Sequence, residues 1–437
     1  MGKWYAVRPH ARLAARTTAR HEGSRKRILA VSDAPHPESN GHLGYYIEHG
    51  ISPVTYRTDD IGAHFDRRDS LYRSLGLPAI AFKGADVLEV APGSGQNSLY
   101  VAACAPASLT LVEPNPTGRR DIAAAYANLQ VAHTAPELIA ETLQRFAPER
   151  RFDIVICENW LGGTPNELNL LAKLAGFVTP GGALVITTVP LAGFFPNIMR
   201  KLLALRLVPA DMSFERKTSV LIEAFGPHLS TVKEMTRSHR DWVHDCLINP
   251  HYLNVSLPLE LVLRTIGTKL ESMATFPRFA TDWRWFKALS GQNRRFNETL
   301  LDAAGRNTLS FIDYRRTFPE RPSAENAPLE AAFAAIHQLA LDWQAAVEGS
   351  DQLRRDQLTN RIGRQIGEIA RLLATADHEL AAAIYELGAI WALPAPAIAD
   401  VNGMKLFNGV FGRESVYVSF TRPRSEDGKA PSGDSNG

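Results

Sequence analysis

The feature of this sequence best suited to chemistry is an acidic side chain followed by a glycine-containing turn. Residues 86–90 (DVLEV) form a short apolar run that enters residues 91–95 (APGSG). A strand that meets a helix through such a turn leaves backbone N–H groups unpaired and lets the main chain approach a ligand closely. Glu89 precedes the turn, where its carboxylate would attract a cationic ligand. Glu113 ends the next apolar run, where it would accept hydrogen bonds from ribose hydroxyls.

A dinucleotide-binding loop is the competing interpretation of this turn. That loop follows the pattern G-x-G-x-x-G, and its helix N-terminus faces a pyrophosphate. Here the third glycine is replaced by Ser98, and Glu89 would repel the pyrophosphate. The pattern therefore favours a ligand that carries positive charge.

The elements that position these acids alternate between short apolar strands and helices. We predict strands at 86–90, 109–113, 129–132, 152–157, 183–189, 271–279 and 415–422, and helices at 61–75, 97–105, 118–128, 137–146 and 167–177. Strands of this length that alternate with helices indicate βαβ units and a parallel sheet with helices on its faces.

Four segments in this order resemble the class I methyltransferases, which take their methyl group from S-adenosylmethionine (SAM). They are residues 89–95 (EVAPGSG), 111–115 (LVEPN), 152–159 (FDIVICEN) and 178–186 (VTPGGALVI), and Ala91 stands where the family's first motif begins with glycine. The resemblance implies an α/β, Rossmann-like fold with a seven-stranded, mostly parallel sheet whose last strand is antiparallel. Residues 65–78 and 412–420 are similar to methyltransferases of type 12 that occur with bacterial glycan genes.

The resemblance also implies which residues bind the cofactor, SAM. Glu89 would face its amino-acid end, Glu113 its ribose, and the small residues of the turn the surface between them. The full set of candidates is Glu89, Ala91, Gly93, Gly95, Asn97, Glu113, Pro114, Asn115, His133, Glu158 and Asn159.

Candidate catalytic residues lie in a segment dense in histidine, arginine and aspartate, residues 238–245 (SHRDWVHD). A hydroxyl acceptor benefits from a general base, which is usually histidine or a carboxylate. We name His239, His244 and Asp245 as candidates, and on a helix Asp245 would share a face with Asp241. The alternative is an exposed polar helix with one buried tryptophan.

Two insertions follow from the predicted strand order. The predicted division is a flexible basic segment (1–45), a SAM-binding core (46–189), a lid over the substrate (190–258), a core helix and strand (259–279), a mainly helical insertion (280–411), the final core strand (412–422) and a disordered tail (423–437). We favour a lid helix at residues 194–206 over a membrane-surface helix. For residues 282–285 (DWRW) we favour packing at a domain junction over stacking on a sugar.

The composition of the sequence limits the classes of partner and ligand that we expect. The net charge of +2 provides no broad field for nucleic acid, and the prolines and glycines within residues 177–199 argue against a membrane span. The three cysteines lack metal-ligand or redox spacing, so we expect no metal and a cytoplasmic location. The basic N-terminus is more typical of a solvated tail than of a polyanion-binding arm or a transit peptide. The helical insertion could serve a homo-oligomer.

The sequence thus predicts a SAM-dependent methyltransferase that O-methylates a small-molecule, sugar or glycan acceptor. One alternative is an acceptor of another class, such as a secondary metabolite or a lipid quinone. A second is a non-catalytic protein that retains the fold, and a dehydrogenase is a more distant third.

Overall fold

The structure is a computed structural model that describes residues 41–52 and 58–424. The predicted basic tail before residue 41 and almost all of the predicted polar tail lie outside these residues. Within them, no helix combines the length and the apolar character that crossing a bilayer requires.

A seven-stranded sheet forms the centre of the fold, in the order β3-β2-β1-β4-β5-β7-β6. The strands are β1 (Asp86–Val90), β2 (Ser108–Val112), β3 (Glu137–Ile139), β4 (Phe152–Cys157), β5 (Val178–Thr188), β6 (Glu271–Phe276) and β7 (Val416–Thr421). β1 to β5 pair in parallel, and β7 runs antiparallel to both β5 and β6. The predicted fold class, a mostly parallel Rossmann-like sheet with an antiparallel last strand, is confirmed.

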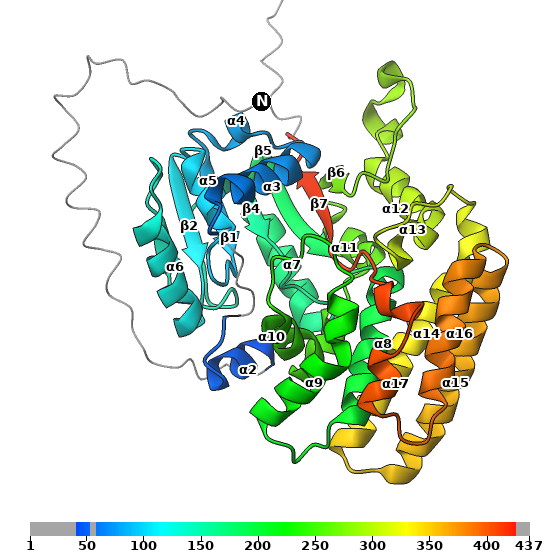
Figure 1. Cartoon of the computed structure of the whole chain (residues 1–437). Helices are drawn as coiled ribbons and strands as arrows, with labels where there is room; N and C mark the ends of the chain where they lie inside the picture. The colour runs from blue at the N-terminus through cyan, green and yellow to red at the C-terminus, as the bar shows by residue number, and fades with distance from the viewer. Residues whose placement is uncertain (1–40, 53–57, 425–437) are drawn as a thin grey trace, which may run out of the picture.

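Helices cover both faces of this sheet (Figure 1). In the first half of the chain they are α2 (His42–Glu48), α3 (Ile61–Ser74), α4 (Ala79–Phe82), α5 (Ser98–Ala103), α6 (Pro116–Asn128) and α7 (Pro165–Gly176). Alternate residues of β4 point to opposite faces, so Ile154 and Ile156 pack with α3, α5 and α6, whereas Val155 and Cys157 pack with α7. Each face therefore has its own apolar core.

The second half of the chain adds helices beyond the sheet. They are α8 (Leu191–Leu207), α9 (Phe214–Leu229), α10 (His239–Trp242), the π-helix η1 (Val243–Ile248), the 3₁₀ helix η2 (Tyr252–Val255), α11 (Leu259–Ile266), the 3₁₀ turns η3 (Phe286–Ala288) and η4 (Gly291–Asn293), α12 (Phe296–Arg306), α13 (Thr308–Ile312), α14 (Ser323–Glu348), α15 (Gln352–Ala374), α16 (His378–Trp391), α17 (Ile398–Asn402) and η5 (Phe407–Gly409). α14, α15 and α16 form a layer that packs on α8 through α14 (Figure 1).

Three predictions about local structure are wrong. The third strand is not at 129–132 but at β3, within the predicted helix 137–146, because Thr110–Val112 of β2 pairs with it. Residues 42–45 are not a lead-in, since they begin α2, whose Tyr45 is buried. Residues 282–285 do not pack at a junction, because Trp283 is 90% exposed and Trp285 is 65% exposed.

Candidate functional site

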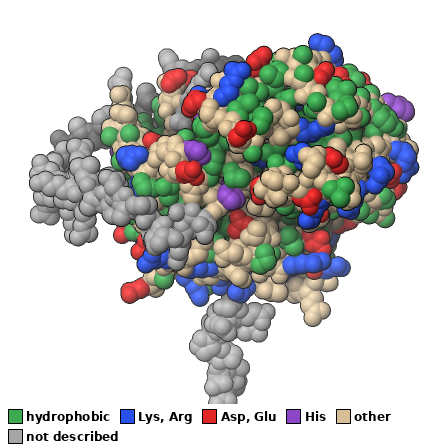
Figure 2. All heavy atoms as spheres, turned by 90° about the horizontal axis from the view of Figure 1, so that it is seen from below, with side chains coloured by type: hydrophobic (Ala, Val, Ile, Leu, Met, Phe, Trp, Pro, Cys, Tyr) green, Lys and Arg blue, Asp and Glu red, His purple; other side chains and the backbone are tan. Residues whose placement is uncertain are grey.

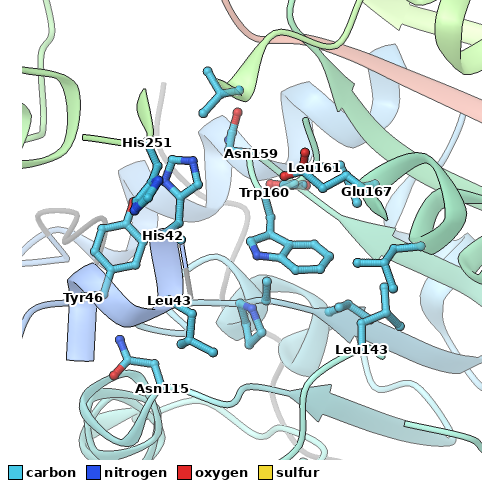
Figure 3. A pocket seen from close by; sticks show the side chains of 18 of the residues that line it. His42, Leu43, Tyr46, Asn115, Leu143, Asn159, Trp160, Leu161, Glu167 and His251 are labelled. Carbon is cyan, nitrogen blue, oxygen red and sulfur yellow. The ribbon is translucent and has the colours of Figure 1, made fainter. Parts of the chain in front are cut away.

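A cavity of about 580 Å³ opens at the carboxyl ends of β1, β2 and β4. Ligands bind at this edge in parallel α/β sheets. One wall, which we call the cofactor wall, is made by residues 89–94, 97, 112–115, 142–144 and 158–161. The opposite wall, the lid wall, is made by residues of α2 and by residues 237, 245–246, 251–252, 254–255 and 414–415. Figure 3 shows Asn159, Trp160 and Leu161 facing His42, Tyr46 and His251 across the cavity.

The turn after β1 is held in a conformation that brings its backbone to the cavity. Ala91, Gly93 and Gly95 have φ angles of 56°, 58° and 71°, in the left-handed region. A Cβ on Gly95 would lie 2.5 Å from Ile122, so glycine is required there for close packing. Ala91 and Gly93 line the cavity, whereas Gly95 shapes the turn from behind.

Glu113 fastens this turn to the end of β2. Its carboxylate accepts hydrogen bonds from the backbone N–H of Gly93 (2.9 Å) and of Asn115 (2.8 Å). Burial raises the pKa of Glu113 to about 7, although these two bonds act in the opposite direction. Asn115 in turn caps α6 by accepting from the N–H of Thr117. The acid predicted to bind ribose therefore also sets the shape of the turn.

Two further acids, Glu89 and Glu158, lie side by side at the tips of β1 and β4. Glu89 is 3% exposed, and burial, together with the charge of Glu158, raises its pKa to about 8. Glu158 forms a buried ion pair with Arg68 of α3 (2.6 Å) and accepts a bond from the hydroxyl of Tyr72. The Oε2 atoms of both acids lack a hydrogen-bond partner among the described residues.

This arrangement fits SAM. When bound, SAM supplies a methyl group on a cationic sulfonium and also carries an ammonium group. Buried carboxylate oxygens without partners are costly unless a donor or cation reaches them. Glu89 and Glu158 offer two such oxygens beside a turn with exposed backbone, and Glu113 follows β2, where the resemblance places the ribose.

The lid wall joins α2 to residues far along the chain. The hydroxyl of Tyr46 donates to Asp245 (2.5 Å), and Arg237 donates to the other oxygen of Asp245 (2.7 Å). His42 contacts the side-chain amide of Asn249 through Nδ1 (3.0 Å), and burial lowers its pKa to about 4. Two tethers thus hold α2 over the cavity.

Of the three predicted catalytic residues, the structure places only Asp245 at the cavity. His239 is half-exposed and lines no part of the cavity, whereas His244 is buried against Phe214 and contacts the hydroxyl of Thr218. Asp245 does line the cavity, but both of its oxygens are engaged. These side chains do not share the predicted face because residues 243–248 form the π-helix η1. A π-helix has more residues in each turn than the α-helix assumed for this segment.

His133 is also displaced from its predicted role. It lies in the loop between α6 and β3, where Nδ1 contacts the carbonyl of Val131, and it lines no part of the cavity. The prediction followed from placing the third strand at 129–132. Because β3 is later, Thr142 and Leu143 take the place beyond its end.

Several cavity residues were not among the named candidates. They are His42, Tyr46, His251 and Glu414, together with Arg68 behind Glu158. The aromatic and histidine content of residues 249–252 was a usable signal for His251. No local pattern marks Arg68, because it stands among other charged residues of α3.

A family model described as a methyltransferase domain matches residues 65–238. No curated protein sequence matches the chain. Similar solved structures include magnesium protoporphyrin IX methyltransferase from Synechocystis (13% identity, TM-score 0.33, covering 53% of this chain and 89% of that one) and the N-methyltransferase NodS from Bradyrhizobium japonicum (12%, 0.29, 50% and 88%). The CcbJ methyltransferase from Streptomyces caelestis is similar at 18% identity and a TM-score of 0.22, over 25% of this chain and less than half (45%) of that one.

The match to the family model covers β1 to β5, which carry the turn and the acids Glu89, Glu113 and Glu158. Residues 65–238 therefore carry a methyltransferase domain, and its sheet and cavity fit the class I fold and a SAM cofactor.

Proposed function

We propose that this methyltransferase transfers the methyl group to a hydroxyl of a small uncharged acceptor, such as a sugar or glycan unit, held between Trp160 and the lid wall. The lid role predicted for residues 190–258 rests in this proposal on residues 237–255, since α8 is buried against α14 and lines no part of the cavity. The observation that carries it is the placement of His251 on the lid wall, facing Trp160 (Figure 3).

His251 is suited to accept the proton of the hydroxyl. Burial lowers its pKa below 6.5, so the imidazole is neutral at neutral pH. Among the described residues, no hydrogen bond engages the His251 ring, in contrast to that of His244. Its ring centroid lies 5.6 Å from that of His42, whose Nδ1 is already occupied by Asn249.

Charge around the cavity disfavours a phosphorylated acceptor. Six acids line it, namely Glu89, Glu113, Glu158, Glu167, Asp245 and Glu414, whereas Arg237 is the only lysine or arginine among the described lining residues. Arg237 is paired with Asp245. Basic and acidic side chains are interspersed on the described part of the face seen in Figure 2. Indole rings suit the apolar face of a sugar, and carboxylates suit its hydroxyls.

The test is methyl transfer from SAM to panels of neutral sugars, sugar nucleotides and phenols, followed by mass spectrometry of the products. We expect His251→Ala to lower kcat about 100-fold or more. Because burial lowers the pKa of His251, the rate of the native chain should fall only at a pH below the usual range for histidine. The matched control is His239→Ala, which removes a histidine outside the cavity and should leave kcat unchanged. Transfer to phenols alone or to sugar nucleotides alone, or full kcat in His251→Ala, contradicts the proposal.

A further inference from the structure

The segment between β6 and α12 projects from the body of the molecule (Figure 1) and presents aromatic side chains to solvent. Trp283, Trp285 and Phe286 are 90%, 65% and 67% exposed. Large aromatic side chains are usually buried, and a cluster of exposed ones marks an interaction surface. We call residues 280–295 the aromatic protrusion.

The base of the protrusion is built to hold these side chains outward. Arg284 forms an ion pair with Asp282 (2.5 Å) and donates to the backbone carbonyl of Asn293 (2.9 Å), which closes the loop. Arg294 pairs with Glu271 of β6, and its guanidinium lies 5.3 Å from the ring centroid of Phe296. The aromatic tip is thus exposed on an anchored loop.

Basic side chains surround the tip. Lys287 is exposed, with its amine 5.8 Å from the ring centroid of Trp285, and Arg278 and Arg295 are exposed nearer the base. Asp282 is the only acid within residues 278–295, and it is paired with Arg284. The exposed charge of this segment is therefore positive, although the whole chain carries only +2.

The edge of the sheet continues the same surface. β6 is the edge strand of the sheet, so one of its sides has no strand neighbour among the described residues. Its Met273 and Phe276 are each 43% exposed. Phe276 pairs with Tyr417, which lines the cavity. The protrusion therefore begins one strand away from the cavity wall.

We infer that the aromatic protrusion is a docking surface for an anionic membrane. Tryptophan is enriched at the interface between water and lipid, and lysine and arginine gain binding energy from anionic headgroups. A projecting tip can enter that interface without a complementary groove, whereas single-stranded nucleic acid requires a groove that follows its backbone. A second copy of the chain would bring like charges together.

The test is sedimentation of the full chain with vesicles of phosphatidylglycerol and phosphatidylcholine, compared with vesicles of phosphatidylcholine alone. We expect binding to the anionic vesicles that weakens as salt is added. The combined variant Trp283→Ala, Trp285→Ala and Phe286→Ala should lower the vesicle partition coefficient by about tenfold or more. Methyltransferase activity in solution should be unchanged, because these residues lie outside the cavity.

Tyr385→Ala is the matched control, since it removes an aromatic side chain that is 54% exposed on α16. It should bind vesicles as the native chain does. Absence of binding to anionic vesicles, or binding that the combined variant retains in full, overturns the inference. Dimerisation in sedimentation velocity that the combined variant abolishes would assign the surface to a second copy and overturn it as well.

Discussion

The two walls of the cavity are built in different ways. The cofactor wall comes mainly from residues 89–161, where each acid stands at a strand tip and the next strand lies beside it. The lid wall depends on contacts between residues 199 and 207 positions apart, such as Tyr46 with Asp245 and His42 with Asn249. The residues of the cofactor wall can be identified from neighbouring segments of the sequence. Those of the lid wall come together only when distant segments of the chain fold against each other.

The walls also differ in how their acids are used. Glu89 and Glu158 each keep a buried oxygen without a partner among the described residues. On the lid wall, Asp245 is bound on both oxygens, and Glu414 accepts from Asn197 and Tyr252. Glu89 and Glu158 therefore each keep an oxygen for a ligand, whereas Glu113 and the acids of the lid wall hold the shape of the cavity. Substitutions on the cofactor wall should change SAM affinity, and substitutions on the lid wall should change the KM for the acceptor.

The largest effect is expected from Glu113→Ala. This change removes two hydrogen bonds from a carboxylate to the turn and also the ribose acceptor. The loss of about 2–3 kcal/mol corresponds to SAM binding that is about 100-fold weaker, measured by calorimetry. Glu141→Ala, an exposed acid outside the cavity, is the control. SAM affinity within twofold of the native value in Glu113→Ala would show that the turn does not depend on this acid.

The second largest effect is expected in the pH dependence of SAM affinity, through the ionisation of Glu89. Its pKa is raised to about 8, so its charged fraction, which attracts the sulfonium, grows as the pH rises toward 8. Between pH 6 and pH 7 this fraction increases about tenfold. The SAM affinity of the native chain relative to Glu89→Gln should rise by about the same factor. A constant ratio over this range would mean that Glu89 is already ionised or does not face the ligand.

The cofactor wall could be predicted from sequence because its signals are local. Glu89 and Glu113 each end an apolar run, and parallel pairing places their ends at one edge. β3 was misplaced because it has three residues and only Leu138 and Ile139 are apolar, too few to outweigh the helical pattern of 137–146. Strand pairing with β2 decides its place, and a single segment does not contain that information.

The lid wall could be predicted only in outline. The sequence identifies residues 238–245 as a chemically dense segment, but which of its side chains face the cavity depends on η1 and on contacts with α9. α2 has no amphipathic pattern long enough to identify it, and its partners are on another part of the chain. Tertiary contacts therefore choose His251 over His239 and His244.

A smaller effect is expected from Tyr46→Phe, which tests whether the walls act separately. The change removes the 2.5 Å hydrogen bond to Asp245 and so loosens α2. A loss of about 1 kcal/mol corresponds to an acceptor KM about fivefold higher. SAM affinity should stay within twofold, and Tyr385→Phe should change neither quantity. Equal losses in SAM affinity and acceptor KM would show that the two walls form one coupled unit.

The smallest effect concerns the backbone of the turn. Ala91 has a φ angle of 56°, which costs a residue with a Cβ about 1–2 kcal/mol, whereas glycine adopts it without steric cost. Glycine also loses more conformational entropy on folding, so Ala91→Gly should raise the free energy of unfolding by only about 0.5–1 kcal/mol. Ala124→Gly, at an exposed position within α6, should lower it by about the same amount. Opposite signs in the two denaturation curves would show that Ala91 is strained, whereas equal losses would mean that the turn tolerates alanine without cost.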